Sequence, residues 1–310
     1  MSRTKLMAAA VAATILITGC SKEETPTTPQ RDNDRALNVT GGIQALTRAH
    51  DATWETGDAI GIYMFENKST TISEGAENRK YTTTGNGSFS PVTTPADQTI
   101  YFPITGKTDF TAYYPWQSIT KDANDKYFYA VDVSNQTSQK AIDLMAAAMV
   151  IAKDKDHRDV KFEFAHQLAK IVLTDIKHGE GLTADDLMGL TVKLTKQYTK
   201  ATYNIMGGDD VAVNTTETPT DITLLVAADS KSAEAIVLPA PSTTGMELVF
   251  TLANGDEYRW ALSNAIQSRT FTAAHKYGYK ITISKKGLNI TSSIFDWLPG
   301  NGTDEEGTAQ

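Results

Sequence analysis

Apolar and polar residues alternate in many short segments of this chain, and segment 54–65 shows the pattern most fully. In its sequence, W-E-T-G-D-A-I-G-I-Y-M-F, the isoleucines and the methionine fall on one face of a strand, and Tyr63 and Phe65 fall on the other. A period of two predicts a β-strand. We expect Trp54 to be a large anchor and Gly57-Asp58 to form a tight turn. A strand that is apolar on both faces is expected at the centre of a sandwich.

Other segments rich in aromatic and β-branched residues, separated by turn-forming residues, predict further strands. The predicted strands are residues 37–46, 59–66, 79–83, 98–103, 109–114, 126–133, 160–164, 169–176, 190–195, 200–205, 222–226, 235–239, 246–252, 257–262, 277–283 and 288–298. Asn254-Gly255 predicts a hairpin of the type I′ kind, and T-A-D-D at 183–186 predicts one short helix. Segment 143–151 fits either a helix or a buried strand. Many short strands at near-regular spacing indicate an all-β fold built of β-sandwiches.

A run of charged residues, K-D-K-D-H-R-D at 153–159, interrupts the strand pattern near the middle of the chain. The run fits a linker or an exposed hairpin. Because the length of the chain suits two domains of ordinary size, we place a domain boundary within this run. The prediction is an N-terminal β-sandwich domain at residues 36–156 and a C-terminal β-sandwich domain at residues 157–310.

The first residues have the pattern of a bacterial lipoprotein signal. Arg3 and Lys5 form a positive region, and the apolar run at 7–17 is too short to span a bilayer. The run ends in I-T-G-C, where small residues precede Cys20 as they do in a lipobox. Cys20 is the one cysteine of the chain, so an intramolecular disulfide is excluded. We predict a signal peptide at residues 1–19 and lipidation of Cys20, which would make the protein an outer membrane lipoprotein; the alternative is a plain secretory signal.

Residues 20–35 are rich in Thr, Pro and charged residues, which predicts a polar, disordered tether. Its first residues, S-K-E-E, resemble the surface-export signal of some Gram-negative lipoproteins, or they form a charged linker. The formal net charge of the chain is −8, and loss of the two cationic residues of the signal peptide makes it more acidic. An acidic surface argues against nucleic acid as a partner.

The sequence offers no clear chemistry. Gly106-Lys107-Thr108 ends like a phosphate loop but lacks the first glycine of that motif. The five histidines do not form a metal-binding spacing, and His166, which is flanked by apolar residues, is expected to be a core or interface histidine. We expect no enzyme activity, no cofactor and no metal, although a pair of carboxylates that meets only in space would escape detection.

Several segments, taken in order, resemble the fimbrillin family, the lipoprotein subunits of type V pili in Gram-negative bacteria. They are the lipobox with its tether, T-R-A at 47–49, segment 54–65, Y-F-P at 101–103, F-T-A-Y-Y-P at 110–115, D-L-M-A-A at 143–147, F-E-F-A-H-Q-L-A-K-I at 162–171, F-T-A-A-H-K-Y-G-Y-K-I at 271–281 and I-F-D-W at 294–297. The resemblance implies two transthyretin-like β-sandwich domains in tandem. It also implies a structural role in a cell-surface fimbria, as stalk, tip or anchor. The expected partners are other fimbrial subunits and surface ligands of host or bacterial cells.

The resemblance also implies a mode of assembly. Family members are cut by an arginine-specific protease after an early strand, and loss of that strand opens a groove that another subunit fills. The residue that matches the cut site is Arg48, although Arg31 and Arg35 also lie in accessible chain. The strand before it, 37–46, contains the pair Gly41-Gly42, and glycines add no side chain to pack and weaken a strand.

The last alternating apolar run of the chain is the candidate donor strand. Its apolar residues are Leu288, Ile290, Ile294 and Leu298. In a stalk subunit this strand is expected to leave and fill the groove of a neighbour. In a tip subunit it is expected to complete its own C-terminal domain.

A protein of another class would share many of these features, namely a surface glycan-binding lipoprotein of a polysaccharide-uptake system. Such a protein would stack sugar rings on exposed aromatic side chains. The candidates are Trp116, Trp260, Tyr113 and Tyr114. Core packing is the commoner fate of aromatic residues on strands, so their burial decides between the two classes.

Overall fold

The computed structural model describes residues 33–44, 53–208, 210–265 and 269–296, and the side chains of the last strand up to residue 291. Within these ranges the regular structure is almost entirely β-strand, which confirms the all-β prediction. The helical segments described are short: η1 (Asn33–Arg35), α1 (Gln139–Ile142), η2 (Asp185–Leu187) and η3 (Leu262–Asn264). None of the described helices is long and apolar enough to cross a membrane.

Strand β2 (Thr56–Glu66) is covered on both faces, as its sequence predicts. Ile60, Ile62 and Met64 belong to one hydrophobic core. Tyr63 and Phe65 belong to another, where their rings stack with centroids 6.2 Å apart. Because successive side chains of a strand point to opposite faces, this one strand joins both cores.

Strand β2 also pairs with two strands of the same sheet, β3 and β5, and so closes that sheet into a ring. Eight described strands pair in the order β2-β3-β4-β1-β9-β7-β5-β8, and β2 additionally pairs with β5. The other members are β1 (Asn38–Ile43), β3 (Arg79–Thr84), β4 (Ser88–Pro91), β5 (Thr108–Tyr114), β7 (Met145–Ala147), β8 (Val150–Lys153) and β9 (Asp159–His166). We call this sheet the closed sheet. Closure gives β2 a partner on each side and leaves it no free edge.

The charged run at 153–159 lies inside the closed sheet, where it forms the turn between β8 and β9. The Lys153 ammonium donates a hydrogen bond to the Asp159 carbonyl across this turn, with a distance of 2.9 Å. The run thus connects two strands of the same sheet, which are not hydrogen-bonded neighbours in it. Charged side chains solvate such a turn as well as a linker. The boundary placed between residues 156 and 157 therefore falls in a turn within the closed sheet, and the chain leaves this sheet after His166. All described residues belong to one compact unit.

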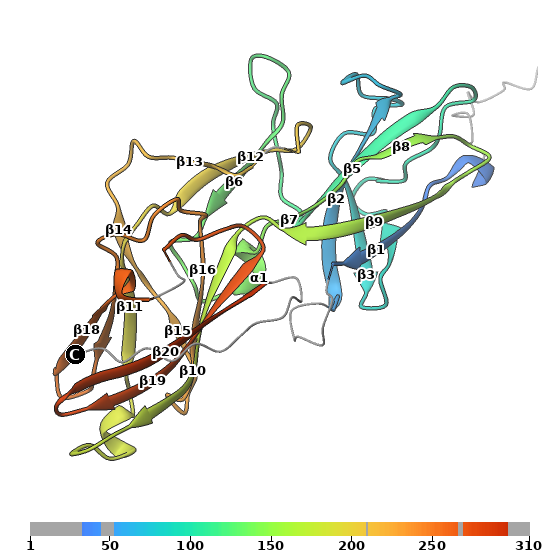
Figure 1. Cartoon of the computed structure of the whole chain (residues 1–310). Helices are drawn as coiled ribbons and strands as arrows, with labels where there is room; N and C mark the ends of the chain where they lie inside the picture. Colours follow the sequence, from blue (N-terminus) through green and yellow to red (C-terminus); the bar gives the residue numbers. More distant parts are fainter. Residues whose placement is uncertain (1–32, 45–52, 209, 266–268, 297–310) are drawn as a thin grey trace, which may run out of the picture. The chain divides into compact units, whose positions relative to one another are not determined.

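The remaining described strands form three sheets (Figure 1). The β19 sheet has the order β15-β16-β10-β19-β20, the β11 sheet has the order β14-β11-β17-β18, and the β12 sheet has the order β13-β12-β6. Their bounds are β6 (Phe128–Asp132), β10 (Ala169–His178), β11 (Thr191–Gln197), β12 (Lys200–Asn204), β13 (Ala212–Val213), β14 (Thr220–Thr223), β15 (Leu225–Val226), β16 (Ala233–Val237), β17 (Glu247–Thr251), β18 (Glu257–Ala261), β19 (His275–Ser284) and β20 (Gly287–Asp296). Trp260 of β18 packs edge-on against Tyr279 of β19 with ring centroids 5.4 Å apart, so the β11 and β19 sheets share one core.

The structure corrects two local predictions, the strand at 98–103 and the type of the turn at Asn254-Gly255, and it settles two others. Residues 98–103 make only an isolated bridge from Tyr101 to Ala36, and strand β4, at Ser88–Pro91, was not predicted. Segment 143–151, left open as helix or strand, contains β7 and the start of β8. Asn254-Gly255 does join a hairpin, β17 to β18, but Gly255 alone of this pair has a positive φ, so the turn is not of type I′. The helix predicted at 183–186 is the single turn of η2.

Candidate functional site

Strand β1 is an interior strand of the closed sheet. It runs antiparallel to β4, with Val39 opposite Phe89, and parallel to β9, with Ile43 opposite Phe164. The Gly41 amide donates to the Gly87 carbonyl at 2.8 Å on the β4 side. An interior strand forms backbone hydrogen bonds with a strand on each side. Loss of β1 would therefore leave the backbone N–H and C=O groups that face it on β4 and on β9 unpaired.

The side chains of β1 alternate as a half-buried strand requires. Leu37, just before the strand, and Val39 are 6% and 4% exposed and belong to the core of the closed sheet. Asn38 and Thr40 point the other way and are exposed. The apolar face of β1 therefore covers part of that core.

The glycine pair of β1 has a steric role that the sequence did not reveal. A Cβ atom on Gly41 would lie 2.9 Å from Cε2 of Phe89 and 3.1 Å from Cε2 of Phe164. A Cβ atom on Gly42 would lie 2.7 Å from a carboxylate oxygen of Glu163. Gly41 therefore lets the backbone of β1 approach the two aromatic rings closely, whereas the atom near Gly42 is the flexible end of a side chain.

Trp54 is the anchor that the sequence predicts, and it holds β1. Its indole N–H donates a buried hydrogen bond of 2.7 Å to the Gly41 carbonyl. Its ring meets three other rings edge-on, with centroid distances of 5.0 Å to Phe89, 5.3 Å to Phe164 and 5.4 Å to Tyr114. Such edge-to-face pairs add to the area that the rings bury. The indole therefore ties the middle of β1 to the floor of the groove.

Two predicted site residues and residues 20–32 of the predicted tether lie outside the described residues. The last residues predicted for the tether, 33–35, form η1, and the Arg35 guanidinium donates a hydrogen bond to the Phe102 carbonyl, so this end of the segment is ordered and not disordered. Cys20 falls in 1–32 and Arg48 falls in 45–52. The described residues on either side of Arg48, Gln44 and Thr53, are both exposed.

The candidate donor residues lie on β20, the last strand of the β19 sheet. Among described strands its partner is β19, with which it pairs antiparallel from Gly287 to Asp296 (Figure 1). Ile290 is 3% exposed and Leu288 is partly buried against the same core. The backbone of Ile294 is opposite Tyr277, and Leu298 lies outside the described residues. The structure thus places β1 and β20 in different sheets.

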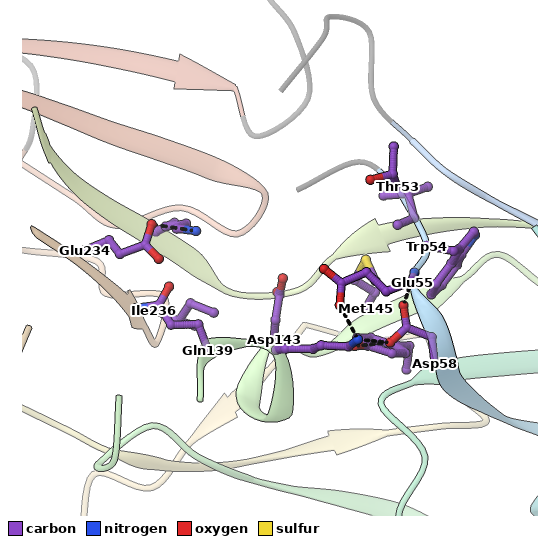
Figure 2. A pocket seen from close by; sticks show the side chains of 13 residues that line it. Thr53, Trp54, Glu55, Asp58, Gln139, Asp143, Met145, Glu234 and Ile236 are labelled. Carbon is purple, nitrogen blue, oxygen red and sulfur yellow. Dashed lines mark hydrogen bonds and ion pairs between the residues drawn. The ribbon is translucent and has the colours of Figure 1, made fainter. Parts of the chain in front are cut away.

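A pocket lies where β2 begins, and charged side chains line it (Figure 2). Its volume is about 170 Å³. The Lys140 ammonium of α1 lies 2.7 Å from carboxylate oxygens of both Glu55 and Asp58. Asp58 is 5% exposed and also accepts a hydrogen bond from the Tyr114 hydroxyl at 3.1 Å. Burial would lower the pKa of Lys140, but the hydrogen bonds to Asp58 and Glu55 outweigh it and raise that pKa.

These contacts have a structural role: they hold helix α1 against the turn at the start of β2. The Asp58 amide donates to the Glu55 carbonyl at 3.1 Å, and Gly57 has a positive φ, which confirms the tight turn predicted at Gly57-Asp58. The ammonium of Lys140 then binds this turn from another part of the chain. Sequence reasoning missed Lys140, because no local pattern links it to a turn more than 80 residues earlier.

His166 has the environment expected of a core histidine. It is 3% exposed, and its Nδ1 lies 2.9 Å from a carboxylate oxygen of Asp143. Among the described residues, no three His, Cys, Asp or Glu side chains are grouped so that they could hold a metal ion.

The aromatic side chains considered as sugar platforms are mostly buried. Tyr113, Tyr114 and Trp260 are 0%, 5% and 5% exposed. Trp116 is half-buried, and the ammonium of Lys80 lies 4.4 Å from its ring centroid. In the described ranges Phe128 is the one aromatic residue in the exposed class. A planar pair of exposed rings is therefore absent from the described residues, which argues against the glycan-binding alternative.

The known proteins that this chain resembles are fimbrial and cell adhesion proteins. Residues 47–297 match the family profile described as fimbrillin-like. Fim1C, a candidate fimbrium subunit of Bacteroides uniformis, is 45% identical over 306 residues, which cover 97% of each chain. A crystal structure of a candidate cell adhesion protein from the same species is 46% identical, with a TM-score of 0.74, over 85% of this chain and 99% of that one. A candidate cell adhesion protein from Bacteroides ovatus, 21% identical, shares the fold with a TM-score of 0.68 over 86% of this chain and 99% of its own.

Proposed function

Because this chain belongs to the fimbrillin-like family, we propose that it is a structural subunit of a cell-surface fimbria that serves adhesion. The names of its relatives, a candidate fimbrium subunit and a candidate cell adhesion protein, support this role. The role is that of a stalk, tip or anchor and involves no catalysis or cofactor. Its partners are other fimbrial subunits, and its ligands are molecules of host or bacterial surfaces.

Before the cut after Arg48, the N-terminus attaches the subunit to the outer membrane in this proposal. The signal peptide at 1–19 is removed, Cys20 carries the lipid, and the polar tether at 20–35 spaces the folded part from the membrane. More than one acyl chain makes such anchoring stable. The support is the lipobox pattern of the sequence.

Assembly proceeds by strand exchange after proteolysis. The observation that carries this step is the position of β1 between β4 and β9, because the strand is interior yet close to the start of the chain. A cut after Arg48 separates β1 from Trp54 and from all later strands. The strand β1 can then leave, because no covalent bond links it to the rest of the closed sheet. Departure exposes the rings of Phe89 and Phe164 and two unpaired strand edges. An added strand regains both the hydrogen bonds and the apolar contacts.

The fate of β20 separates the two subunit types. In a stalk, the strand with Leu288, Ile290, Ile294 and Leu298 fills the groove of a neighbour. In a tip it stays in the β19 sheet, where it pairs with β19 in the structure, and the subunit only accepts a strand.

Limited proteolysis tests the proposal. Purified protein cleaved with an arginine-specific protease is expected to form ladders of oligomers that resist warm detergent. The variant Arg48→Ala is expected to form none, and Arg31→Ala, which leaves the link between β1 and Trp54 cleavable, is expected to behave as the wild type. Ladders that persist unchanged in Arg48→Ala would remove Arg48 from the mechanism. Absence of ladders from wild-type protein that is demonstrably cut at Arg48 would argue against a self-polymerising stalk.

A further inference from the structure

One of the five described arginines, Arg269, has no partner for its guanidinium. Arg35, Arg79 and Arg259 donate hydrogen bonds from their guanidinium groups, and Arg158 also has a partner. The guanidinium of Arg269, by contrast, is exposed and makes no hydrogen bond or ion pair with any residue that the structure describes. In a chain with a formal net charge of −8, a cation without a carboxylate partner is available to an anion from outside.

Arg269 lines a polar pocket in the second half of the chain. The pocket has a volume of about 460 Å³, which lies within the range of about 300–1,000 Å³ that small-molecule sites occupy. Its described lining contains no acidic residue, and apart from Arg269 and one proline every member carries a hydroxyl group. These members are Pro241, Ser242, Thr243, Thr244, Ser263 and Thr270. The pocket therefore combines one positive charge with several groups that can donate and accept hydrogen bonds.

Two of these hydroxyl groups are available to a ligand. The hydroxyls of Ser242 and Thr244 are used within the pocket wall, where one bonds to the other at 2.9 Å. The hydroxyls of Ser263 and Thr270 make no hydrogen bond to any described residue, and both side chains are exposed. A ligand that reaches the guanidinium can therefore also bond to Ser263 and Thr270.

The backbone beneath the pocket is held in place. Ala240 and Phe271 exchange two backbone hydrogen bonds of 2.8 Å, and the Thr243 amide donates to the Arg269 carbonyl at 2.9 Å. Phe271 is 2% exposed and packs edge-on against Tyr277, with ring centroids 5.1 Å apart. Arg269 thus lies two residues from a buried anchor. A binding group on a fixed backbone loses less conformational freedom when its ligand arrives.

A second, more apolar pocket adjoins the polar one. Pro241 and Thr270 line both, and the volume of the second pocket is about 510 Å³. Its wall includes Pro239, and its described acidic residue, Asp210, can accept hydrogen bonds from hydroxyl groups. A ligand with its charged group at Arg269 can therefore place an apolar C–H face against the prolines and point further hydroxyls towards Asp210.

These features define the chemistry of the ligand. The planar guanidinium fork matches the geometry of a carboxylate, which it binds through two parallel hydrogen bonds. A single cation balances a carboxylate better than a phosphate group, whose charge at pH 7 is about −1.5 to −2. The hydroxyl groups of the wall complement a ligand that carries hydroxyls itself. A sugar acid combines all three features, namely a carboxylate, several hydroxyls and an apolar C–H face.

We propose that this pocket binds a sugar acid, with the carboxylate on the guanidinium of Arg269 and hydroxyls on Ser263 and Thr270. The inference rests on the proposed function, because adhesion requires a surface ligand, and it adds the chemical class of that ligand. Recognition by charge needs no pair of exposed aromatic rings, so this site differs from the stacking platforms that the structure argues against. Uronic acids and nonulosonic acids share the required chemistry, because both present a carboxylate beside a ring oxygen.

An NMR titration tests the ligand class. The full-length protein carries Cys20→Ala, so that no acyl chain is attached, and it is labelled with ¹⁵N. Glucuronate and N-acetylneuraminate are added in separate titrations, and the sugar acid that binds identifies its source. Glucose is the neutral control, because it matches glucuronate except for the carboxylate. The Nε–H signal of Arg269, identified by its absence from Arg269→Gln, is expected to shift with at least one sugar acid and to stay unchanged with glucose.

Three variants test the role of the guanidinium. Arg269→Gln removes the charge, and we expect it to weaken binding of the sugar acid by about tenfold or more. Arg269→Lys keeps the charge but not the fork, so a smaller loss of affinity is expected. Arg259→Gln is the matched control: Arg259 is also exposed but pairs with Glu247 and Glu257 outside the pocket, and this variant is expected to bind as the wild type does.

The outcomes separate the inference from the proposed function. No binding of either sugar acid, equal binding of glucose, or equal losses in Arg259→Gln and Arg269→Gln would overturn the inference. Equal affinity for an acetylated dipeptide with a free terminal carboxylate would overturn the sugar acid as the ligand class. Any of these results, obtained with protein that still forms protease-induced ladders, would leave the fimbrial role standing. Binding that depends on Arg269, in protein that forms no ladders after cleavage at Arg48, would uphold the site and count against the self-polymerising stalk.

Discussion

The indole of Trp54 connects the strand that is proposed to leave with the rest of the closed sheet. Its N–H bonds to Gly41 across 2.7 Å, and the ring is 8% exposed. A buried carbonyl that loses its donor costs more than the net worth of one hydrogen bond, because water does not replace the partner. The residue therefore sets how firmly β1 is held before cleavage.

Replacing Trp54 by phenylalanine keeps an aromatic ring but removes the donor. We expect Trp54→Phe to lower the free energy of unfolding by about 1–3 kcal/mol, measured by urea denaturation, and to speed hydrogen exchange at the β1 amides. Trp116→Phe is the matched control: its indole N–H donates to the Asn78 carbonyl at 3.3 Å from a half-buried position, and we expect a smaller loss. Equal losses of unfolding free energy in both variants would show that the hydrogen bond from Trp54 to Gly41 stabilises the protein no more than the hydrogen bond from Trp116 does.

At the scale of elements, Asp109 at the start of β5 ties three segments together. It is 2% exposed and accepts hydrogen bonds of 2.7 Å from the amides of Lys68 and Ala152 and from the side chain of Asn67. Burial by itself would raise the pKa of this carboxyl. The three hydrogen bonds outweigh burial and hold the pKa below its ordinary value.

A carboxyl with a depressed pKa in the folded state stabilises the protein above its unfolded pKa, and this stabilisation is lost as the pH falls through the folded pKa. We expect Asp109→Asn to lower the free energy of unfolding by about 1–3 kcal/mol at pH 7. The difference in the free energy of unfolding between the wild type and Asp109→Asn should become smaller as the pH falls below about 4. Urea denaturation across this range measures both.

Asp122→Asn is the control for this pH dependence. Hydrogen bonds from the Lys126 and Asn124 amides lower the pKa of Asp122 as well, but its side chain is exposed. We therefore expect it to change stability less than Asp109→Asn. A gap between wild type and Asp109→Asn that stays constant from pH 7 to the acid limit would contradict the assignment of the acid sensitivity to this residue.

At the scale of the whole molecule, lipidation decides where the subunit resides. Labelled palmitate is expected to enter the wild-type protein and not Cys20→Ala, because the thiol is the site of acylation in a lipobox. Gel autoradiography of the two proteins measures this directly. Ser21→Ala, next to the acceptor, is expected to keep the label. Equal labelling of wild type and Cys20→Ala would refute the lipoprotein interpretation.

The periodic features of the chain could be predicted without any structure. Runs of aromatic and β-branched residues between turn-forming residues located β2, β5, β9, β10 and most other strands, because such side chains pack well on the faces of a sheet. The missed strand β4, S-F-S-P, is too short to show a period.

Sequence patterns could not predict which strands pair or which distant residues come into contact. The insertion of β1 between β4 and β9, the closure of β2 onto β5, and the binding of Lys140 to Asp58 all join residues that are distant in the chain. Local propensity carries no information on such contacts, since they depend on how separate segments share a core. The glycine pair illustrates the difference: the sequence shows two weak strand formers, and the rings of Phe89 and Phe164 show why only small residues fit there.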